Sequence, residues 1–209
     1  PDGKKVAFIA GRDALKVYDR ESKEITTALS ADYNYSYADG DITYAWAPDS
    51  KWLTVDFAAN GRLFFTNIAI VPADGSAAPR DISLSGYTDT GPAWHSSGGI
   101  VTWYTARYGQ RDHGSHGSQY DVFAGFLNQE AWDKFNLSKE ELELKKEADA
   151  DAEEAEEKAR QEAEAQETEK SDDSEKAEEK DDSEKKEEDK SITIEWDQLE
   201  DRQRRLTIH

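Results

Sequence analysis

Residues that could do chemistry are concentrated in one stretch of the sequence, residues 104–118. His113 and His116 lie three positions apart beside Asp112, and metal sites are built from such side chains. Gly114 and Gly117 interrupt this stretch, so it cannot fix ligand directions as a helix does, and no third ligand is evident. We therefore expect no metal and no cofactor, and a glycine-rich loop whose polar side chains bond to its own backbone.

The same stretch contains serines but no setting for a serine nucleophile. Ser115 and Ser118 lie near the histidines. A nucleophile also needs a base oriented by a third group and donors for an oxyanion. No Gly-x-Ser-x-Gly turn joins a strand to a helix, which is the setting that displays such a serine. We therefore expect no catalytic residue in this chain.

Arginine and tyrosine side chains just ahead of the histidines suit peptide binding. An arginine can pair with a peptide carboxylate through two hydrogen bonds, and a tyrosine offers a ring face and a hydroxyl. The alternative is that the arginines pair with aspartates of their own sheet. The candidate substrate-binding residues are Tyr104, Arg107, Tyr108, Arg111, His113 and His116.

A second candidate is the segment 33–41. Its tyrosines alternate at positions 33, 35 and 37, which fits an extended edge strand with the rings on one face. Asp39-Gly40-Asp41 lacks the spaced ligands of a calcium loop. A turn with Gly40 at positive φ is the preferred interpretation.

Repeated turns indicate which elements must position these residues. Pro1-Asp2-Gly3-Lys4 recurs 47 positions later as Pro48-Asp49-Ser50-Lys51, and a weaker copy follows Trp94, 48 positions after Trp46. Each turn precedes a β-rich run, as in a hairpin. Trp46, Trp94 and Trp103 are expected to pack between repeats. Strands are predicted at 5–10, 14–18 and 24–29, at 42–46, 52–57, 67–71 and 80–83, and at 90–94, 100–105, 121–126 and 204–208.

Four short strands in each unit of roughly 40–50 residues are typical of a β-propeller blade. We predict an all-β fold, a partial β-propeller of two full four-stranded blades plus part of a preceding one. Residues 192–196 also alternate, and they either continue the third strand of the last blade or add a strand. The alternative fold is a β-sandwich with similar strand spacing.

An acidic insertion interrupts the last blade. Between Glu141 and Lys190 there are 24 acidic and 10 basic residues, and no aromatic residue occurs between Phe135 and Trp196. Ser138 and Glu141 form a capping-box pattern, which predicts a helix to about residue 166, and 167–190 is expected to be disordered. The insertion is either a tolerated surface excursion or an electrostatic docking tail. The predicted domains are blades at 1–135, the insertion at 136–190 and returning strands at 191–209.

Composition excludes several classes of protein. The formal net charge is −20 and there is no basic stripe, so nucleic acid is not an expected partner. There is no run of 18 apolar residues, so no membrane span is expected. The chain has no cysteine, which excludes disulfide and thiolate chemistry. It begins at Pro1 and contains no methionine, so we expect a piece of a longer protein.

Several stretches resemble known propellers. The Pro-Asp-Gly-Lys turns are similar to TolB-like and WD-type propeller repeats. Residues 33–41, 46–53, 86–89 and 104–117 resemble the propeller region of bacterial tricorn-type serine proteases. The Lys- and Glu-rich insertion, followed by 199–202 and 205–207, is similar to the same region.

The tricorn resemblance implies a function as well as a fold. Such enzymes carry two propellers ahead of a catalytic region with a PDZ-like domain, and they cleave oligopeptides with a serine nucleophile and a histidine base. This chain would be part of the second, seven-bladed propeller and would serve as a substrate channel or scaffold, with the catalytic residues downstream. The alternative is a TolB-like propeller that binds a protein partner and has no protease attached.

The resemblance also implies partners. These are peptide substrates and the rest of the protease chain. The oligomeric state is left open, and a homo-oligomer is one of the alternatives. Because members of the family occur in the cytoplasm or are exported, the compartment is left open between cytoplasm and periplasm.

Overall fold

The computed structural model describes residues 1–61, 65–110, 118–169 and 191–207. These form two compact units, Pro1–Trp132 with Lys190–His209, and Asp133–Asp189. The sequence analysis placed the corresponding boundaries after residues 135 and 190.

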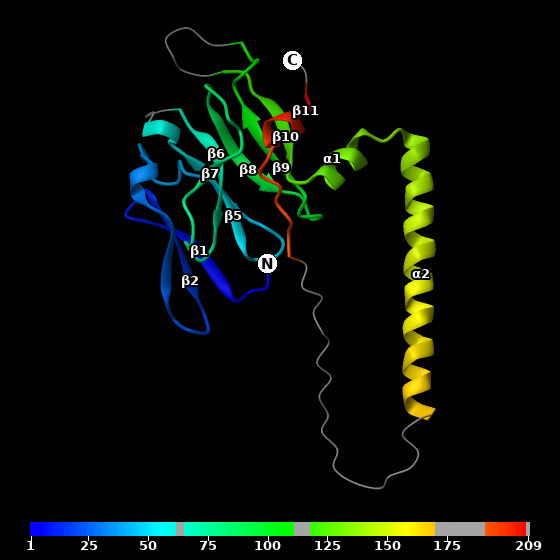
Figure 1. Cartoon of the computed structure of the whole chain (residues 1–209). Helices are drawn as coiled ribbons and strands as arrows, with labels where there is room; N and C mark the ends of the chain where they lie inside the picture. Colours follow the sequence, from blue (N-terminus) through cyan, green and yellow to red (C-terminus); the bar gives the residue numbers. More distant parts are fainter. Residues whose placement is uncertain (62–64, 111–117, 170–190, 208–209) are drawn as a thin grey trace. The chain divides into compact units, whose positions relative to one another are not determined.

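The first unit contains three antiparallel sheets that follow one another along the chain (Figure 1). The first sheet has the order β1-β2-β3 (Lys5–Ala10, Ala14–Asp19, Ile25–Leu29). The second has the order β4-β5-β6-β7 (Tyr44–Trp46, Trp52–Phe57, Asn67–Pro72, Arg80–Asp81). In the third, β8, β9 and β10 (Asp89–Trp94, Ile100–Thr105, Asp121–Phe126) are completed by β11 (Gln203–Arg205).

The middle sheet is buried on both of its faces. Leu53 and Val55 of β5, with Ala69 and Val71 of β6, pack into a core shared with the first sheet. The alternate residues Ile68 and Ile70 of β6 pack into a second core shared with the third sheet. Because successive side chains of a strand point to opposite faces, one strand serves both cores.

Two cores on opposite faces of one sheet distinguish the two candidate folds. A sandwich has two layers around one interior, whereas propeller blades stack face to face in series. The chain is therefore a partial β-propeller, with two four-stranded blades preceded by three strands of another, as predicted. The tryptophans also lie as expected, since Trp46 packs on the first core, and Trp94 and Trp103 belong to the second.

The repeated turns share one hydrogen-bond pattern. The Asp2 carboxylate accepts from the backbone N–H of Lys4 (2.8 Å), and Asp49 accepts from that of Lys51 (2.9 Å). In the third copy, Nδ1 of His95 accepts the backbone N–H of Ser97 (3.1 Å). The residue between donor and acceptor in the first two turns is left-handed, with φ of 73° at Gly3 and 57° at Ser50. The aspartate therefore explains why the turn sequence recurs.

Antiparallel order places alternate connections of the chain at the same end of the blades. We call one of the two ends the loop end. It carries the β1–β2 turn, the connections between sheets at 30–43 and 82–88, and the connections 58–66 and 106–120 within sheets. The Pro-Asp turns lie at the opposite end, which we call the turn end.

Residues 191–202, the return segment, bring the chain back to the third blade. Residues 191–196 form no strand, so both alternatives for 192–196, a continuation of the third strand and an added strand, are wrong. Ile192, Ile194 and Trp196 pack against the second core, and Trp196 meets Trp52 edge to face at 6.2 Å. A 3-10 helix, Leu199–Arg202, then leads into β11.

Arg202 holds the return segment in place. Its side chain is almost fully buried, and it donates to the backbone oxygens of Phe126 (3.2 Å), Asp197 (3.1 Å) and Glu195 (2.5 Å). A guanidinium has donors only, so these carbonyls satisfy a charge that would otherwise be costly to bury.

Two helices follow β10. Helix α1 (Gln129–Asn136) was not predicted, although Asn128 caps it by accepting from the N–H of Ala131 (2.8 Å). Trp132 of α1 packs on Phe126, with ring centroids 5.2 Å apart.

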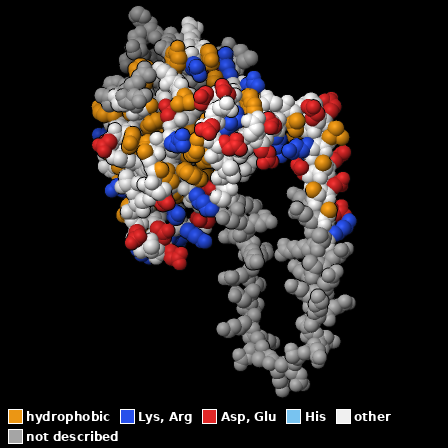
Figure 2. All heavy atoms as spheres, viewed as in Figure 1, with side chains coloured by type: hydrophobic (Ala, Val, Ile, Leu, Met, Phe, Trp, Pro, Cys, Tyr) orange, Lys and Arg blue, Asp and Glu red, His pale blue; other side chains and the backbone are white. Residues whose placement is uncertain are grey.

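The second unit contains helix α2 (Lys139–Glu169), three residues longer than the predicted end at 166. The predicted capping box is present, since Ser138 and Glu141 each accept the other's backbone N–H (3.2 and 2.8 Å). Figure 2 shows acidic side chains along the described part of α2. Among the described helices, none combines the length and the apolar character that crossing a membrane requires. The segment expected to be disordered lies from residue 170 onward outside the described residues.

Candidate functional site

Exposed aromatic side chains gather at the loop end. Seven tyrosine and phenylalanine side chains with substantial exposure lie there: Tyr33, Tyr35, Tyr37, Phe65, Tyr87, Tyr104 and Tyr108. They come from connections of all the blades, except Tyr104, which is the next-to-last residue of β9. Aromatic residues gathered on an exposed surface are typical of sites that bind other molecules.

Tyr108 is the centre of the best-formed group, which we call the Tyr108 cluster: Arg107, Tyr108, Asp121, Phe123 and Arg205. The rings of Tyr108 and Phe123 stack at 5.9 Å between centroids, with an interplanar angle of 16°. The guanidinium groups of Arg107 and Arg205 lie 5.6 and 5.0 Å from the centroid of the Tyr108 ring. Both distances are those of cation–π contacts, so the ring is held in place.

The two arginines of the cluster differ in their charge partners. Arg205 forms an ion pair with the buried carboxylate of Asp121, with 2.7 Å between Nη2 and Oδ2. Asp121 also accepts from the hydroxyl of Thr207 (3.0 Å). For Arg107, which is exposed, there is no ion pair with any of the described residues. Arg107 can therefore offer its guanidinium to a carboxylate from outside the chain.

Sequence reasoning did not identify Asp121 and Arg205 as part of this site. Their proximity depends on the pairing of β10 with β11, which places Arg205 opposite Phe123 across the acidic insertion. The predicted strand at 204–208 contained Arg205 but had no assigned register. Without that register, the sequence could not show which arginine neutralises Asp121.

The structure does not bring all the predicted site residues together. Tyr104 pairs with Val122, whereas Trp103 pairs with Phe123, so Tyr104 lies on the opposite face of the third sheet from the Tyr108 cluster. Its ring lies against Gly91, where an added Cβ would be 2.9 Å from Cδ2 of Tyr104. Arg111, His113 and His116 lie outside the described residues.

A buried carboxylate, Asp56, joins the second and third blades near the same end. It is 1% exposed, and its Oδ2 accepts from the hydroxyls of Thr43 (2.8 Å) and Thr90 (2.7 Å). Its Oδ1 is buried and has no hydrogen bond from any described residue. Burial raises the pKa of Asp56 to about 6, although the hydroxyl hydrogen bonds act in the opposite direction. Because Asp56 is inaccessible, it is a structural group and not a candidate acid or base for a substrate.

A second buried carboxylate, Asp89, begins β8. Burial raises the pKa of Asp89, and the nearby negative charge of Asp81 raises it further. The backbone of Asp89 is fixed to the preceding blade, since its N–H donates to the carbonyl of Thr66 (2.8 Å) and the Thr66 hydroxyl donates to its carbonyl (2.7 Å). Asp56 and Asp89 together place two buried carboxyl groups at the boundary between two blades.

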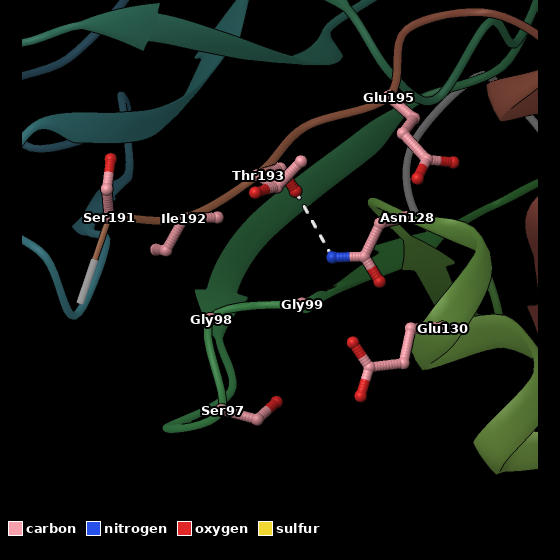
Figure 3. A pocket seen from close by; sticks show the side chains of 9 residues that line it. All are labelled: Ser97, Gly98, Gly99, Asn128, Glu130, Ser191, Ile192, Thr193 and Glu195. Carbon is pink, nitrogen blue, oxygen red and sulfur yellow. Dashed lines mark hydrogen bonds between the residues drawn. The ribbon is translucent and has the colours of Figure 1, made fainter.

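A polar hollow of about 450 Å³ lies at the turn end of the third blade (Figure 3). Asn128 donates to the Thr193 carbonyl (3.2 Å), and Glu195 accepts the N–H of Gln129 (3.0 Å). The polar groups of the hollow thus mainly attach the return segment to the start of α1. The lining residues are Ser97, Gly98, Gly99, Asn128, Glu130, Ser191, Ile192, Thr193 and Glu195.

In the described part of the chain, no group of three or more histidine, aspartate or glutamate side chains is arranged to hold a metal ion. His95, the one histidine among the described residues, bonds to Ser97 in a turn.

Comparisons with known proteins yield similar structures but no family. No protein-family model matches this sequence. No curated protein matches it. The crystal structure of the tricorn protease is similar over 61% of this chain and 13% of its own, with 12% identity and a TM-score of 0.47. The structure of a TolB, described as putative, from Agrobacterium tumefaciens is similar over 61% of this chain and 43% of its own, with 22% identity and a TM-score of 0.45.

This chain therefore spans less than half the length of either similar structure. The assignment of the fold rests on the sheets and their two cores, and not on these two similarities.

Proposed function

We propose that this chain is a non-catalytic β-propeller segment of a tricorn-like serine peptidase that hydrolyses oligopeptides, and that it serves as a substrate channel or scaffold. The Tyr108 cluster is the part of the segment that contacts peptide. In this proposal, Arg107 pairs with a peptide carboxylate, and the fixed ring of Tyr108 packs against the adjoining peptide backbone or side chain.

The observation that supports this proposal is the state of Arg107. It is exposed, it contacts the Tyr108 ring at 5.6 Å, and it has no carboxylate partner among the described residues. The neighbouring Arg205 is neutralised by Asp121. One guanidinium without an ion pair among the described residues and one neutralised guanidinium, around a held ring, support a single point of attachment for an anionic group.

The experiment uses the full-length protein that contains this chain. Hydrolysis of a decapeptide and of a tetrapeptide is measured for the wild type, Arg107→Ala and Tyr108→Ala. We expect kcat/KM for the decapeptide to fall about fivefold to tenfold in each variant, the loss of one charge-assisted contact. The tetrapeptide should be hydrolysed at the wild-type rate.

Arg20→Ala is the matched control, because Arg20 is an exposed arginine at the turn end whose guanidinium donates to the Gly3 carbonyl (2.7 Å). Equal hydrolysis of the decapeptide by the wild type and Arg107→Ala contradicts the role of the cluster. A full-length protein without peptidase activity favours the second candidate, a TolB-like propeller that binds a protein partner. The exposed aromatic residues of the loop end suit that candidate as well.

A further inference from the structure

The connection between the first two blades is a compact loop closed by hydrogen bonds, and not the extended edge strand that its sequence suggested. We call residues 31–41 the tyrosine loop. It begins as a 3-10 helix, Ala31–Tyr33, and Gly40 near its end has φ of 86°, as predicted. The Asp41 carboxylate closes the loop by accepting from the N–H groups of Tyr37 (2.6 Å) and Ala38 (2.8 Å). Burial opposes ionisation of Asp41, but these hydrogen bonds outweigh it and lower the pKa of Asp41.

The tyrosine loop is also attached to the blades on both sides. Arg12, in the β1–β2 turn, contacts Asp39 (2.9 Å, Nε to Oδ1) and donates to the Tyr37 carbonyl (3.2 Å). On the other side, the Ala58 N–H in the second blade donates to the carbonyl of Tyr33 (2.7 Å). Bonds of this kind fix the backbone before any partner arrives, which lowers the entropic cost of binding.

This fixed backbone displays three tyrosine side chains. Tyr33, Tyr35 and Tyr37 are 38%, 48% and 77% exposed. An aromatic side chain on a rigid support has few rotatable bonds to immobilise, and tyrosines of this kind dominate the energy of many interfaces. Tyr37 has the most exposed side chain of the three, and both polar groups of its backbone are bonded. Its N–H donates to Asp41, and its carbonyl accepts from Arg12.

Charge indicates what the loop would accept. The tyrosine loop contains Asp32, Asp39 and Asp41 and no basic residue. The carboxyl group of Asp39 is 89% exposed, although it pairs with Arg12. A cationic side chain can lie over a tyrosine ring and reach a nearby carboxylate at the same time, whereas an anionic one is repelled by all three aspartates.

We propose that the tyrosine loop is a docking site for an extended polypeptide segment that carries arginine or lysine side chains. The cation of the segment lies over the Tyr37 ring, and Asp39 exchanges part of its contact with Arg12 for a contact with the incoming charge. This site lies on a different loop from the Tyr108 cluster and takes a cation where that cluster takes a carboxylate. It does not depend on the presence of a protease.

The test measures binding of two labelled octapeptides to the full chain by fluorescence anisotropy. One peptide alternates arginine and serine, and the other alternates glutamate and serine. We expect Tyr37→Ser to weaken binding of the arginine peptide about fivefold to tenfold, as expected for loss of a cation–π contact. Tyr37→Phe keeps the ring and should bind as the wild type does. The glutamate peptide, which suits the Tyr108 cluster, should bind Tyr37→Ser and the wild type equally.

The acidic insertion also attracts a cationic peptide, but the charge-neutral changes at Tyr37 leave that attraction the same in every variant. Tyr87→Ser, which removes another tyrosine of the loop end, is the matched control and should leave the affinity within twofold of the wild type. Circular dichroism checks that each variant is folded. Equal affinity of Tyr37→Ser and the wild type for the arginine peptide overturns the proposal.

A second measurement locates the peptide directly. A photo-crosslinking group placed beside one arginine of the peptide should label residues 31–41 or the Arg12 turn, as identified by mass spectrometry. Labelling confined to the acidic insertion also overturns the proposal. Arg107→Ala should leave arginine-peptide binding unchanged, so failure of the Tyr108 cluster as a peptide site and failure of the tyrosine loop are distinguishable.

Discussion

Replacing Asp56 by asparagine should make the protein more stable at neutral pH. Asp56 lies between the second and third blades, and its Oδ2 accepts from the hydroxyls of Thr43 and Thr90. An asparagine has nearly the same shape and can keep its carbonyl oxygen at this position. Its NH2 group would take the place of Oδ1, which has no hydrogen-bond partner among the described residues.

The size of the effect follows from the pKa. Burial raises the pKa of Asp56 from 3.8 to about 6. The folded state therefore binds the proton more tightly than the unfolded state. Protonation of Asp56 makes its full contribution to the free energy of unfolding only below about pH 4. This contribution is lost as the pH rises through about 6. At about 1.4 kcal/mol for each pH unit, the loss is about 3 kcal/mol. Asp56→Asn carries no titrating group and avoids the loss.

The assay is urea unfolding of the full chain followed by tryptophan fluorescence between pH 4.5 and 8. Other carboxylates also titrate in this range, but they are the same in both proteins, so the difference in the free energy of unfolding isolates Asp56. We expect the free energy of unfolding of Asp56→Asn, relative to that of the wild type, to increase by about 2–3 kcal/mol from pH 4.5 to pH 8. Asp13→Asn, the same chemical change at an aspartate in the β1–β2 turn at the loop end, is the control.

A difference between Asp56→Asn and wild type that stays constant from pH 4.5 to 8 would falsify the reasoning. It would mean that the folded state does not retain the proton, and that Asp56 is ionised throughout. A variant that is less stable by a constant amount at every pH would show, in addition, that the charge on the hydroxyl-bonded oxygen contributes more than its burial costs.

Three further predictions concern other parts of the chain. Arg202→Ala should lower the free energy of unfolding by about 3–5 kcal/mol in urea titrations, because three backbone carbonyls lose their buried donor; exposed Arg20→Ala should change it by less than about 0.5 kcal/mol. Ser138→Ala should destabilise the start of α2 by about 1 kcal/mol, seen as faster amide hydrogen exchange over the first turn of the helix, since the capping bond to Glu141 is lost; unchanged exchange there would show that the cap is dispensable. Gly109→Ala should open the base of the 106–120 connection, because the added Cβ would overlap the Gln119 carbonyl, and amide exchange at Gln119 should accelerate about tenfold or more; protection equal to the wild type would contradict this.

The arrangement of the blades could be predicted because it is encoded locally and repeated. Asp2 and Asp49 each close a turn by bonding to the backbone two residues ahead, so the same short sequence marks the same position in successive blades. Alternation then predicted the strands that follow. Four of the eleven predicted strands have the observed bounds and six differ by one or two residues at one end, since the last residues of a strand depend on neighbouring strands and not on their own sequence.

The sites were harder to predict because they depend on contacts between distant residues. Arg205 lies beside Tyr108 only because the chain returns after the insertion to pair with β10. The tyrosine loop was predicted to be extended from its alternation, but Asp41 and Arg12 impose a compact conformation through bonds that the pattern cannot show. Asp56 gave no sequence signal at all, since its burial arises between two blades.

The return segment has a consequence for engineering. Because 191–202 is fastened to two blades by Arg202, Trp196 and Ile192, the register of β11 is set by this segment and not by the chain that precedes it. The free energy of closing a loop grows only with the logarithm of its length, by about 0.6 kcal/mol for each doubling. A foreign domain, such as a fluorescent reporter, could therefore replace the acidic stretch after Ser138. We expect β11 still to pair with β10 in such a protein.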